Sequence, residues 1–246
     1  MIAYRRAKKL FEYRTPNDSF SRLAQISQQP ATFEFPRKQL PLQFYFCGPL
    51  HDLSGPQAID FPFEKLTDQP LIYMSLGTIQ NRPLQFYEMI ATACASLEVQ
   101  LVISLGGSTQ LSQLPSLPGS PIVVKFAPQL ALIRRSDLVI THGGLNTTLE
   151  SLAHGVPLIA IPITNDQPGV AARIEWTKVG EFLSVSQVNG QNLQQKIRQV
   201  LTDPKYQQKA RQMQKDIQSS GGVKFAVDII ERAAATGKAV QSRSPD

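Results

Sequence analysis

The sequence predicts an α/β fold built on a doubly wound parallel sheet, and two patterns support this prediction. From Pro70 onward, short apolar runs alternate with segments of helical periodicity. Apolar runs between helices are typical of strands that helices cover on both faces. The chain has 246 residues, of which 42% are hydrophobic and 18% charged, so it can bury the core that such a fold requires.

The expected elements follow one another in a regular order. The run "PLIYMSLG" at 70–77 predicts the first strand, and the helical periodicity of 83–97 predicts the helix after it. Apolar runs at 99–107 and 121–126 predict the next two strands. The remaining elements are helices at 128–136, 147–154 and 168–180 and strands at 137–142, 156–163 and 181–185, followed by two or three closing helices.

The two ends of the chain differ from this pattern. Residues 1–60 are irregular and proline-bearing, with one expected strand at 42–48 and a linker over 49–62. Residues 61–236 contain the alternating pattern and are expected to form one domain. We expect the tail 237–246 to be disordered, as chain ends often are.

The net charge of +6 is concentrated at the two ends of the chain. Residues 1–40 carry eight Lys or Arg against three acids, whereas residues 41–199 carry nine against eleven. A nucleic-acid site requires basic residues interleaved with aromatic ones where the ligand lies, so we expect no nucleic-acid partner. A basic N-terminal helix has two interpretations: a solvated face, which we favour, or a peripheral membrane contact through Ile2, Leu10 and Phe11.

Several other classes of protein are excluded by features that the sequence lacks. No run offers the roughly 20 consecutive apolar residues of a membrane span. No apolar segment of a signal peptide follows the basic N-terminus, so we expect a cytoplasmic location. Cys47 and Cys94 have neither metal-site nor redox-motif spacing. The dinucleotide, Walker A, nucleophile-elbow and zinc-protease motifs are also absent.

Five successive strand ends carry small or polar residues. Ligands bind outside the carboxyl ends of the strands in doubly wound sheets, so these residues predict a ligand site. They are Ser75, Gly77 and Thr78 after the first strand, Gly106 and Gly107 after the second, residues 126–129 after the third, residues 142–148 after the fourth and residues 164–167 after the fifth.

The segment "THGGLNTTLE" concentrates this chemistry. Two glycines after His142 let the backbone turn and approach a ligand closely, and a helix is expected to begin directly after them. The N–H groups of a helix start favour a phosphate, to which His142 adds a directional donor. Thr147 and Glu150 form a capping-box pattern that explains Glu150 without any ligand, and His154 and Gly155 would end the helix. A tight strand-to-helix turn without a ligand is the alternative interpretation.

With "SLGT" and the stretch from "FAPQ" to "GVAAR", the chain resembles the donor-binding half of the UDP-glycosyltransferases with the GT-B fold. The resemblance covers roughly residues 68–235, and "PITNDQPGVAARIEWTKVGEF" is most similar to bacterial zeaxanthin glucosyltransferase-like members. It implies a Rossmann-like, C-terminal half of a GT-B enzyme. Residues 1–60 would be a remnant of the N-terminal acceptor domain with the interdomain linker, and residues 61–236 the nucleotide-sugar domain.

The resemblance also implies which part of the donor each residue meets. The uracil would lie against Phe126, and the backbone of Ala127 would read its edge. Glu150 would accept both ribose hydroxyls, which suits a carboxylate with two acceptor oxygens. His142 would donate to the diphosphate and stabilise the leaving group, because negative charge grows there as the sugar leaves.

The sugar hydroxyls would be bound by Asp166 and Gln167. No cofactor or metal is expected, because the helix start can neutralise the phosphates. The full set of predicted donor-binding residues is Ser75, Gly77, Thr78, Phe126, Ala127, Gln129, His142, Gly143, Gly144, Asn146, Thr147, Glu150, Asp166 and Gln167.

One feature of the family is absent from the sequence. Its members take the acceptor proton with a histidine of the N-terminal domain, and neither His51 in the linker nor His154 at the far end of the donor helix matches that position. The favoured interpretation is an inverting glycosyltransferase that transfers from a UDP-sugar, expected to be UDP-glucose, to a lipophilic hydroxyl acceptor. The alternatives are a non-catalytic or split subunit that needs an N-terminal-domain partner chain, and an inactive fragment.

Overall fold

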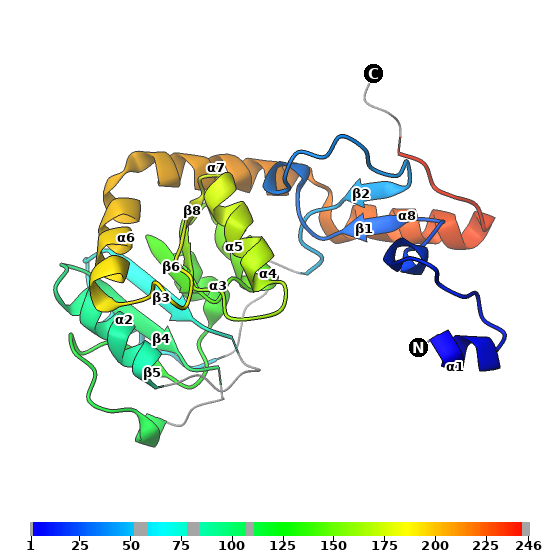
Figure 1. The fold of residues 1–246 in the computed structure, drawn as a ribbon. Helices are drawn as coiled ribbons and strands as arrows, with labels where there is room; N and C mark the ends of the chain where they lie inside the picture. Colours follow the sequence, from blue (N-terminus) through cyan, green and yellow to red (C-terminus); the bar gives the residue numbers. More distant parts are fainter. Residues whose placement is uncertain (1, 52–58, 78–83, 107–110, 243–246) are drawn as a thin grey trace.

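The computed structural model describes residues 2–51, 59–77, 84–106 and 111–242, and it contains a six-stranded parallel sheet (Figure 1). The strand order is β5-β4-β3-β6-β7-β8. This is the doubly wound arrangement, in which β4 and β5 are added on one side of β3, and β6, β7 and β8 on the other. The predicted fold class is therefore confirmed. The strands are β3 (Leu71–Ser75), β4 (Gln100–Ser104), β5 (Ile122–Val124), β6 (Leu138–Thr141), β7 (Leu158–Ala160) and β8 (Gly180–Phe182).

Helices cover both faces of this sheet because the strand side chains alternate between two apolar clusters. Ile72 and Met74 of β3 belong to the cluster that includes α2 and α6, whereas Leu71 and Tyr73 belong to the cluster that includes α3, α4 and α5. All of β3 is buried, as expected for a central strand. The helices are α2 (Gln85–Ala95), α3 (Gln129–Ile133), α4 (Leu145–Ala153), α5 (Gln167–Trp176), α6 (Gly190–Thr202) and α7 (Pro204–Ser219).

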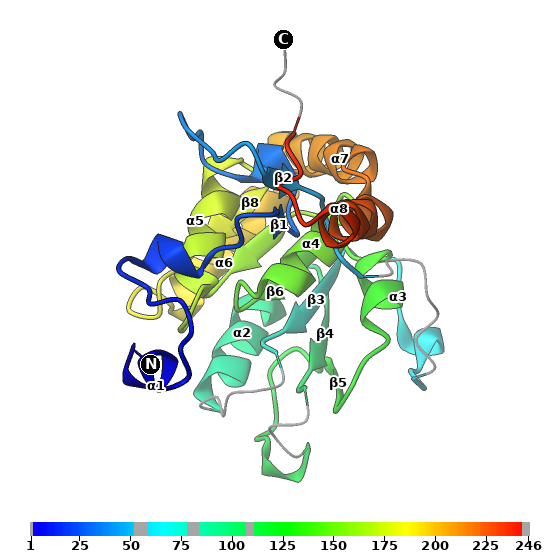
Figure 2. The same cartoon turned by 90° about the vertical axis from the view of Figure 1, so that its right-hand side faces the viewer.

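A smaller unit joins the two ends of the chain. Strands β1 (Gln25–Ser27) and β2 (Phe44–Phe46) pair in parallel, and α8 (Gly222–Thr236) shares an apolar cluster with them. Figures 1 and 2 both place β1, β2 and α8 together, and Figure 1 shows them to one side of the six-stranded sheet. The sequence placed α8 in the 61–236 domain, but the structure packs it against N-terminal residues.

Residues 237–242 continue from α8 along the same strands. Val240 is buried, and its N–H donates to the Leu23 carbonyl oxygen at 2.8 Å, while the Ser242 N–H donates to the Leu42 carbonyl oxygen at 2.7 Å. The prediction of a disordered tail is thus wrong for these residues, and 243–246 lie outside the described ones. The short elements are α1 (Ile2–Ala7), η1 (Pro16–Ser19), η2 (Ala31–Phe33), η3 (Phe63–Lys65) and η4 (Leu111–Gln113).

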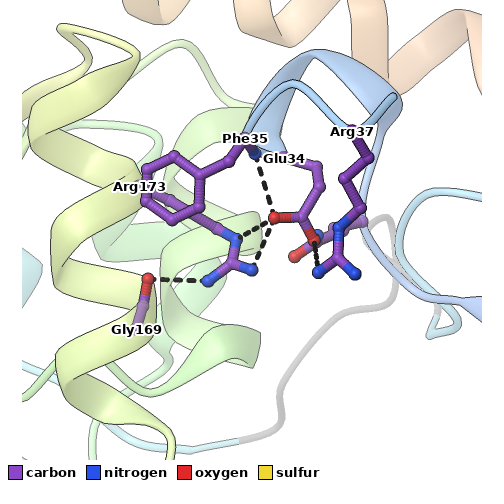
Figure 3. A network of polar contacts seen from close by, with 6 residues as sticks. Glu34, Phe35, Arg37, Gly169 and Arg173 are labelled. Carbon is purple, nitrogen blue, oxygen red and sulfur yellow. Dashed lines mark hydrogen bonds and ion pairs between the residues drawn. The ribbon is translucent and has the colours of Figure 1, made fainter. Parts of the chain in front are cut away.

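An ion pair fastens the N-terminal segment to helix α5. The Glu34 carboxylate accepts hydrogen bonds from the Arg173 guanidinium at 2.5 and 3.0 Å, and Arg173 also donates to the Gly169 carbonyl oxygen (Figure 3). The backbone N–H of Phe35 and the Arg37 side chain donate to the same carboxylate. Arg173 lies in the last turn of α5, so this pair fixes the segment after β1 against the helix whose first residue is the predicted sugar-binding Gln167.

Candidate functional site

A cavity of about 470 Å³ opens at the carboxyl ends of the central strands. It lies between β3 and β6, where the strand order of the sheet reverses. Doubly wound sheets bind ligands at this point. Because Ser75 pairs with Thr141 in the sheet, the residues that follow both strands enter the same cavity. The lining residues are Gln28, Ser75, Leu76, Gly77, Gln129, His142, Gly144, Leu145, Asn146, Thr147, Asn165, Asp166 and Gln167.

Most of the predicted donor-binding residues therefore meet around one space. The exceptions fall into two groups. Four predicted residues do not line the cavity: Phe126, Ala127, Gly143 and Glu150. Two further residues at predicted strand ends, Thr78 and Gly107, lie outside the described residues.

The imidazole of His142 lies between two glycines. A Cβ atom added to Gly144 would be 2.5 Å from His142 Nε2, and one added to Gly77 would be 2.9 Å from His142 Cε1. Gly77 and Gly143 also adopt positive φ angles of 84° and 79°, which L side chains rarely adopt. These glycines are therefore required both for the turns and for the space that the histidine ring occupies.

Helix α4 begins at Leu145, three residues after this histidine. Its N-cap residue is Gly144, which supplies no side-chain hydrogen bond to the first turn. The predicted capping box is wrong, because Thr147 lies inside the first turn rather than at the N-cap. The N–H groups of the first turn have no partner within the helix, so this end can bind an anion. The other end matches the prediction, with His154 as the C-cap and Gly155 at a φ of 69°.

Glu150 lies further along α4, and its side chain is only 12% exposed. Gln129 Nε2 donates to Glu150 Oε2 and also lies 3.4 Å from Thr147 Oγ1. The Tyr73 hydroxyl donates to Gln129 Oε1 at 3.0 Å, and His51 Nε2 lies 3.3 Å from Glu150 Oε1. The Gln129 amide therefore holds one oxygen of the predicted ribose carboxylate, and the His51 ring lies beside the other.

The start of helix α5 forms another part of the cavity lining. Gln167 is buried, and its Oε1 accepts from the backbone N–H groups of Ile163 at 2.8 Å and Thr164 at 3.0 Å. These bonds fix the amide, so its nitrogen is the end that can donate to a ligand. Asp166 is exposed at the N-cap, and Asn165 before it has a φ of 57°.

Four of the lining residues, Gln28, Leu76, Leu145 and Asn165, are not among the predicted donor-binding residues. Leu145 and Asn165 lie within the predicted strand-end segments 142–148 and 164–167, and Leu76 lies between Ser75 and Gly77, so the strand-end rule already covered these three. Gln28 is different, because it follows the short strand β1 in a region that the sequence pattern left irregular.

Phe126 and Ala127 follow β5 outside the cavity. The Phe126 side chain is 47% exposed, and Lys125 Nζ lies 5.7 Å from its ring centroid. Ala127 is buried at the start of the turn into α3. An exposed ring at this position is free to stack on a planar ligand.

Two further properties concern the part of the chain that the structure describes. Within it, no group of three or more His, Cys, Asp or Glu residues could hold a metal ion. None of its helices combines the length and the apolar character that crossing a membrane requires.

The structure is thus an α/β protein with a cavity at the point where the strand order of its sheet reverses. Residues 15–218 match the family model described as "UDP-glucoronosyl and UDP-glucosyl transferase", and the chain belongs to this family. The resemblance read from the motifs is therefore confirmed.

Individual relatives agree with this assignment. The chain is 37% identical over 227 residues to the zeaxanthin glucosyltransferase of Pantoea ananas, covering 92% of this chain and 52% of that protein. It is 30% identical to the NDP-glycosyltransferase YjiC of Bacillus subtilis, covering 90% and 57%. The solved structure of CalG4, the calicheamicin glycosyltransferase, matches with a TM-score of 0.75 at 26% identity, covering 89% of this chain and 54% of that chain. The chain thus spans about half the length of the curated relatives it matches.

Proposed function

We propose that this chain forms the donor site of an inverting glycosyltransferase that transfers a sugar from a UDP-sugar to a hydroxyl group of a lipophilic acceptor, with UDP-glucose as the expected donor. The observation on which the proposal depends most is His142, which lies between two glycines beside a helix start without a side-chain cap. Family membership and the similarity to a zeaxanthin glucosyltransferase support the donor and acceptor classes.

The diphosphate would be held by two kinds of donor. The first-turn N–H groups of α4 and the positive end of its dipole favour a negative charge. His142 supplies a side-chain N–H from the turn before the helix. As the bond between the anomeric carbon and the diphosphate breaks, negative charge moves onto the leaving phosphate, and these fixed donors stabilise it.

The other parts of the donor would be bound by the residues around this point. The exposed ring of Phe126 would stack on the uracil, and the Glu150 carboxylate would accept the ribose hydroxyls. The Gln167 amide nitrogen and the Asp166 carboxylate would bind the sugar, with Gln167 held in position by its backbone contacts.

The proposal assigns no general base to this chain. Among the described residues that line the cavity, the titratable side chains are His142 and Asp166, and both are assigned to the donor. The acceptor pocket and the base would be supplied by the remaining half that the relatives possess. A split subunit that binds the donor and acts only with a partner chain is the second candidate, and the lack of an unassigned titratable side chain among the described lining residues favours it.

Titration calorimetry tests the proposal directly. UDP, UDP-glucose, UDP-N-acetylglucosamine and a dTDP-sugar are titrated into the chain in the presence of EDTA. We expect UDP and UDP-glucose to bind in EDTA, because the helix start and His142 replace a metal at the phosphates. They should bind more tightly than the dTDP-sugar, because a deoxyribose offers the Glu150 carboxylate one hydroxyl fewer. Absence of UDP binding, or binding that requires added magnesium or manganese, would contradict the proposal.

A further inference from the structure

His51 lies on the chain just after β2, far in sequence from the donor motifs, yet it reaches the predicted ribose carboxylate. Its Nε2 atom is 3.3 Å from Glu150 Oε1. The same nitrogen is buried from solvent and has no hydrogen-bond partner within the described residues, so its approach to Glu150 is a close polar contact rather than a hydrogen bond. A buried ring nitrogen directed at a carboxylate is costly unless the two interact, so the contact favours the His51 tautomer that carries a proton on Nε2.

The other oxygen of the carboxylate is fixed from the core of the domain. Tyr73 is almost fully buried, and this burial raises its pKa to about 12, so the hydroxyl keeps its proton and donates to Gln129 Oε1. The amide of Gln129 is thereby oriented with its nitrogen toward Glu150 Oε2. Glu150 Oε2 is therefore held by Gln129, which the buried Tyr73 orients, and Glu150 Oε1 is approached by His51 of the linker.

We propose that His51 is a positioning residue for ribose recognition, which holds Glu150 Oε1 in the orientation in which the carboxylate accepts the ribose hydroxyls. A carboxylate has about four acceptor positions. Gln129 and His51 occupy one on each oxygen, which leaves one on each oxygen for the two hydroxyls of a ribose. The linker thus completes the nucleotide site, an inference that rests on the proposed function.

A purely structural role for His51 predicts a different result. If the ring only packs the linker against α4, its removal lowers the melting temperature and leaves the preference for ribose unchanged. The informative quantity is therefore the ratio of the affinities for UDP and for 2′-deoxy-UDP, because only the ribose contact distinguishes these two ligands.

The experiment measures this ratio by calorimetry on the whole chain. Wild type is expected to prefer UDP by about tenfold, the effect of a lost hydrogen bond to a charged group. His51→Ala is expected to reduce the preference to about threefold or less. His51→Gln, whose amide nitrogen can replace Nε2, is expected to restore it. His154→Ala is the matched control, because His154 contacts the Glu150 carbonyl oxygen rather than the carboxylate.

A double-mutant cycle completes the test. If His51 acts through Glu150, His51→Ala has no further effect on the ratio in a Glu150→Gln background. An unchanged ratio in His51→Ala, with wild type binding UDP and preferring it, would overturn the role of His51 and leave the donor site intact. A wild-type chain that does not bind UDP would overturn the proposed function itself, and the inference with it.

Discussion

The six-stranded sheet and the N-terminal segment both reach the cavity that we propose as the donor site, but different kinds of contact hold them in place. The strands that end at the cavity are packed on both faces, with side chains such as Ile72 and Met74 fully buried. The N-terminal segment is held by the Glu34–Arg173 pair, by the single side chain of Phe33 in the large apolar cluster, and by a small apolar cluster around Tyr45. The fold as a whole fixes the first region, whereas individual side chains fix the second. Single substitutions should therefore alter the second region while the sheet stays folded.

The largest expected effect is a difference between donor binding, which we assign to the sheet region, and sugar transfer. We expect the chain alone to bind UDP-glucose without measurable transfer. Positioning of an acceptor contributes about 7 to 11 kcal/mol to such reactions, and a general base contributes about 10²- to 10⁴-fold in rate. The measurement is UDP release from UDP-glucose with a lipophilic alcohol, with and without an added N-terminal domain of a full-length relative.

Transfer that appears only with the added domain, and is lost in His142→Ala, would agree with this division of roles. Robust transfer by the chain alone would refute it. The search for a base would then turn to His51, His154 and Asp166.

A smaller effect is expected from breaking the contact between the two regions. In Glu34→Gln the Arg173 guanidinium loses its charged partner in a mostly buried position, so the free energy of unfolding should fall by about 1 to 3 kcal/mol. Arg37→Ala is the matched control, because that side chain is half exposed and its pair with Glu34 should contribute at most about 1 kcal/mol. Denaturant unfolding of the three proteins gives both numbers, and equal losses in the two variants would speak against a specific contact.

The same pair predicts a dependence on pH. Burial raises the pKa of Glu34, but hydrogen bonds from the Phe35 backbone and from Arg173 outweigh this effect and hold the pKa below its ordinary value of 4.5. The stabilisation is therefore complete above the unfolded-state pKa and is lost as the pH falls through the lower folded-state pKa. Unfolding measured across this acid range should show a steeper loss of stability in wild type than in Glu34→Gln.

The smallest expected effect concerns the one cavity residue that the N-terminal segment supplies. Gln28→Ala should lower the affinity for UDP-glucose by about 2- to 10-fold, the effect of one neutral hydrogen bond, without changing the free energy of unfolding. Gln39→Ala, an exposed glutamine of the same segment, is the control. An unchanged affinity in Gln28→Ala would restrict the donor site to the sheet region.

The sequence predicted the site residues of the six-stranded sheet but missed those of the N-terminal segment and the linker. The strand-end rule located Ser75, His142 and Asp166 because parallel strands deliver their carboxyl ends to one edge of a sheet. The start of α4 was predicted two residues too late, since Thr-x-x-Glu resembles a capping box although Gly144 is the N-cap. Gln28 lines the cavity and His51 lies beside Glu150, but neither was assigned a site role, because each follows a three-residue strand and so short a strand leaves no periodic pattern.

The central claim is that His142, lying between two glycines, holds the diphosphate. Gly144 has a φ of −65°, which alanine tolerates, so Gly144→Ala acts mainly through the Cβ that would lie 2.5 Å from His142 Nε2. Gly190→Ala, at the start of another helix, is the matched control because a Cβ there meets nothing within 4 Å.

The decisive measurement is the UDP affinity of wild type and these two variants by calorimetry, with melting temperatures as a check on folding. The account predicts that Gly144→Ala weakens UDP binding by about 10- to 100-fold, as expected for a lost hydrogen bond to a charged group, while Gly190→Ala binds like wild type. A folded Gly144→Ala variant that binds UDP as tightly as wild type would contradict it.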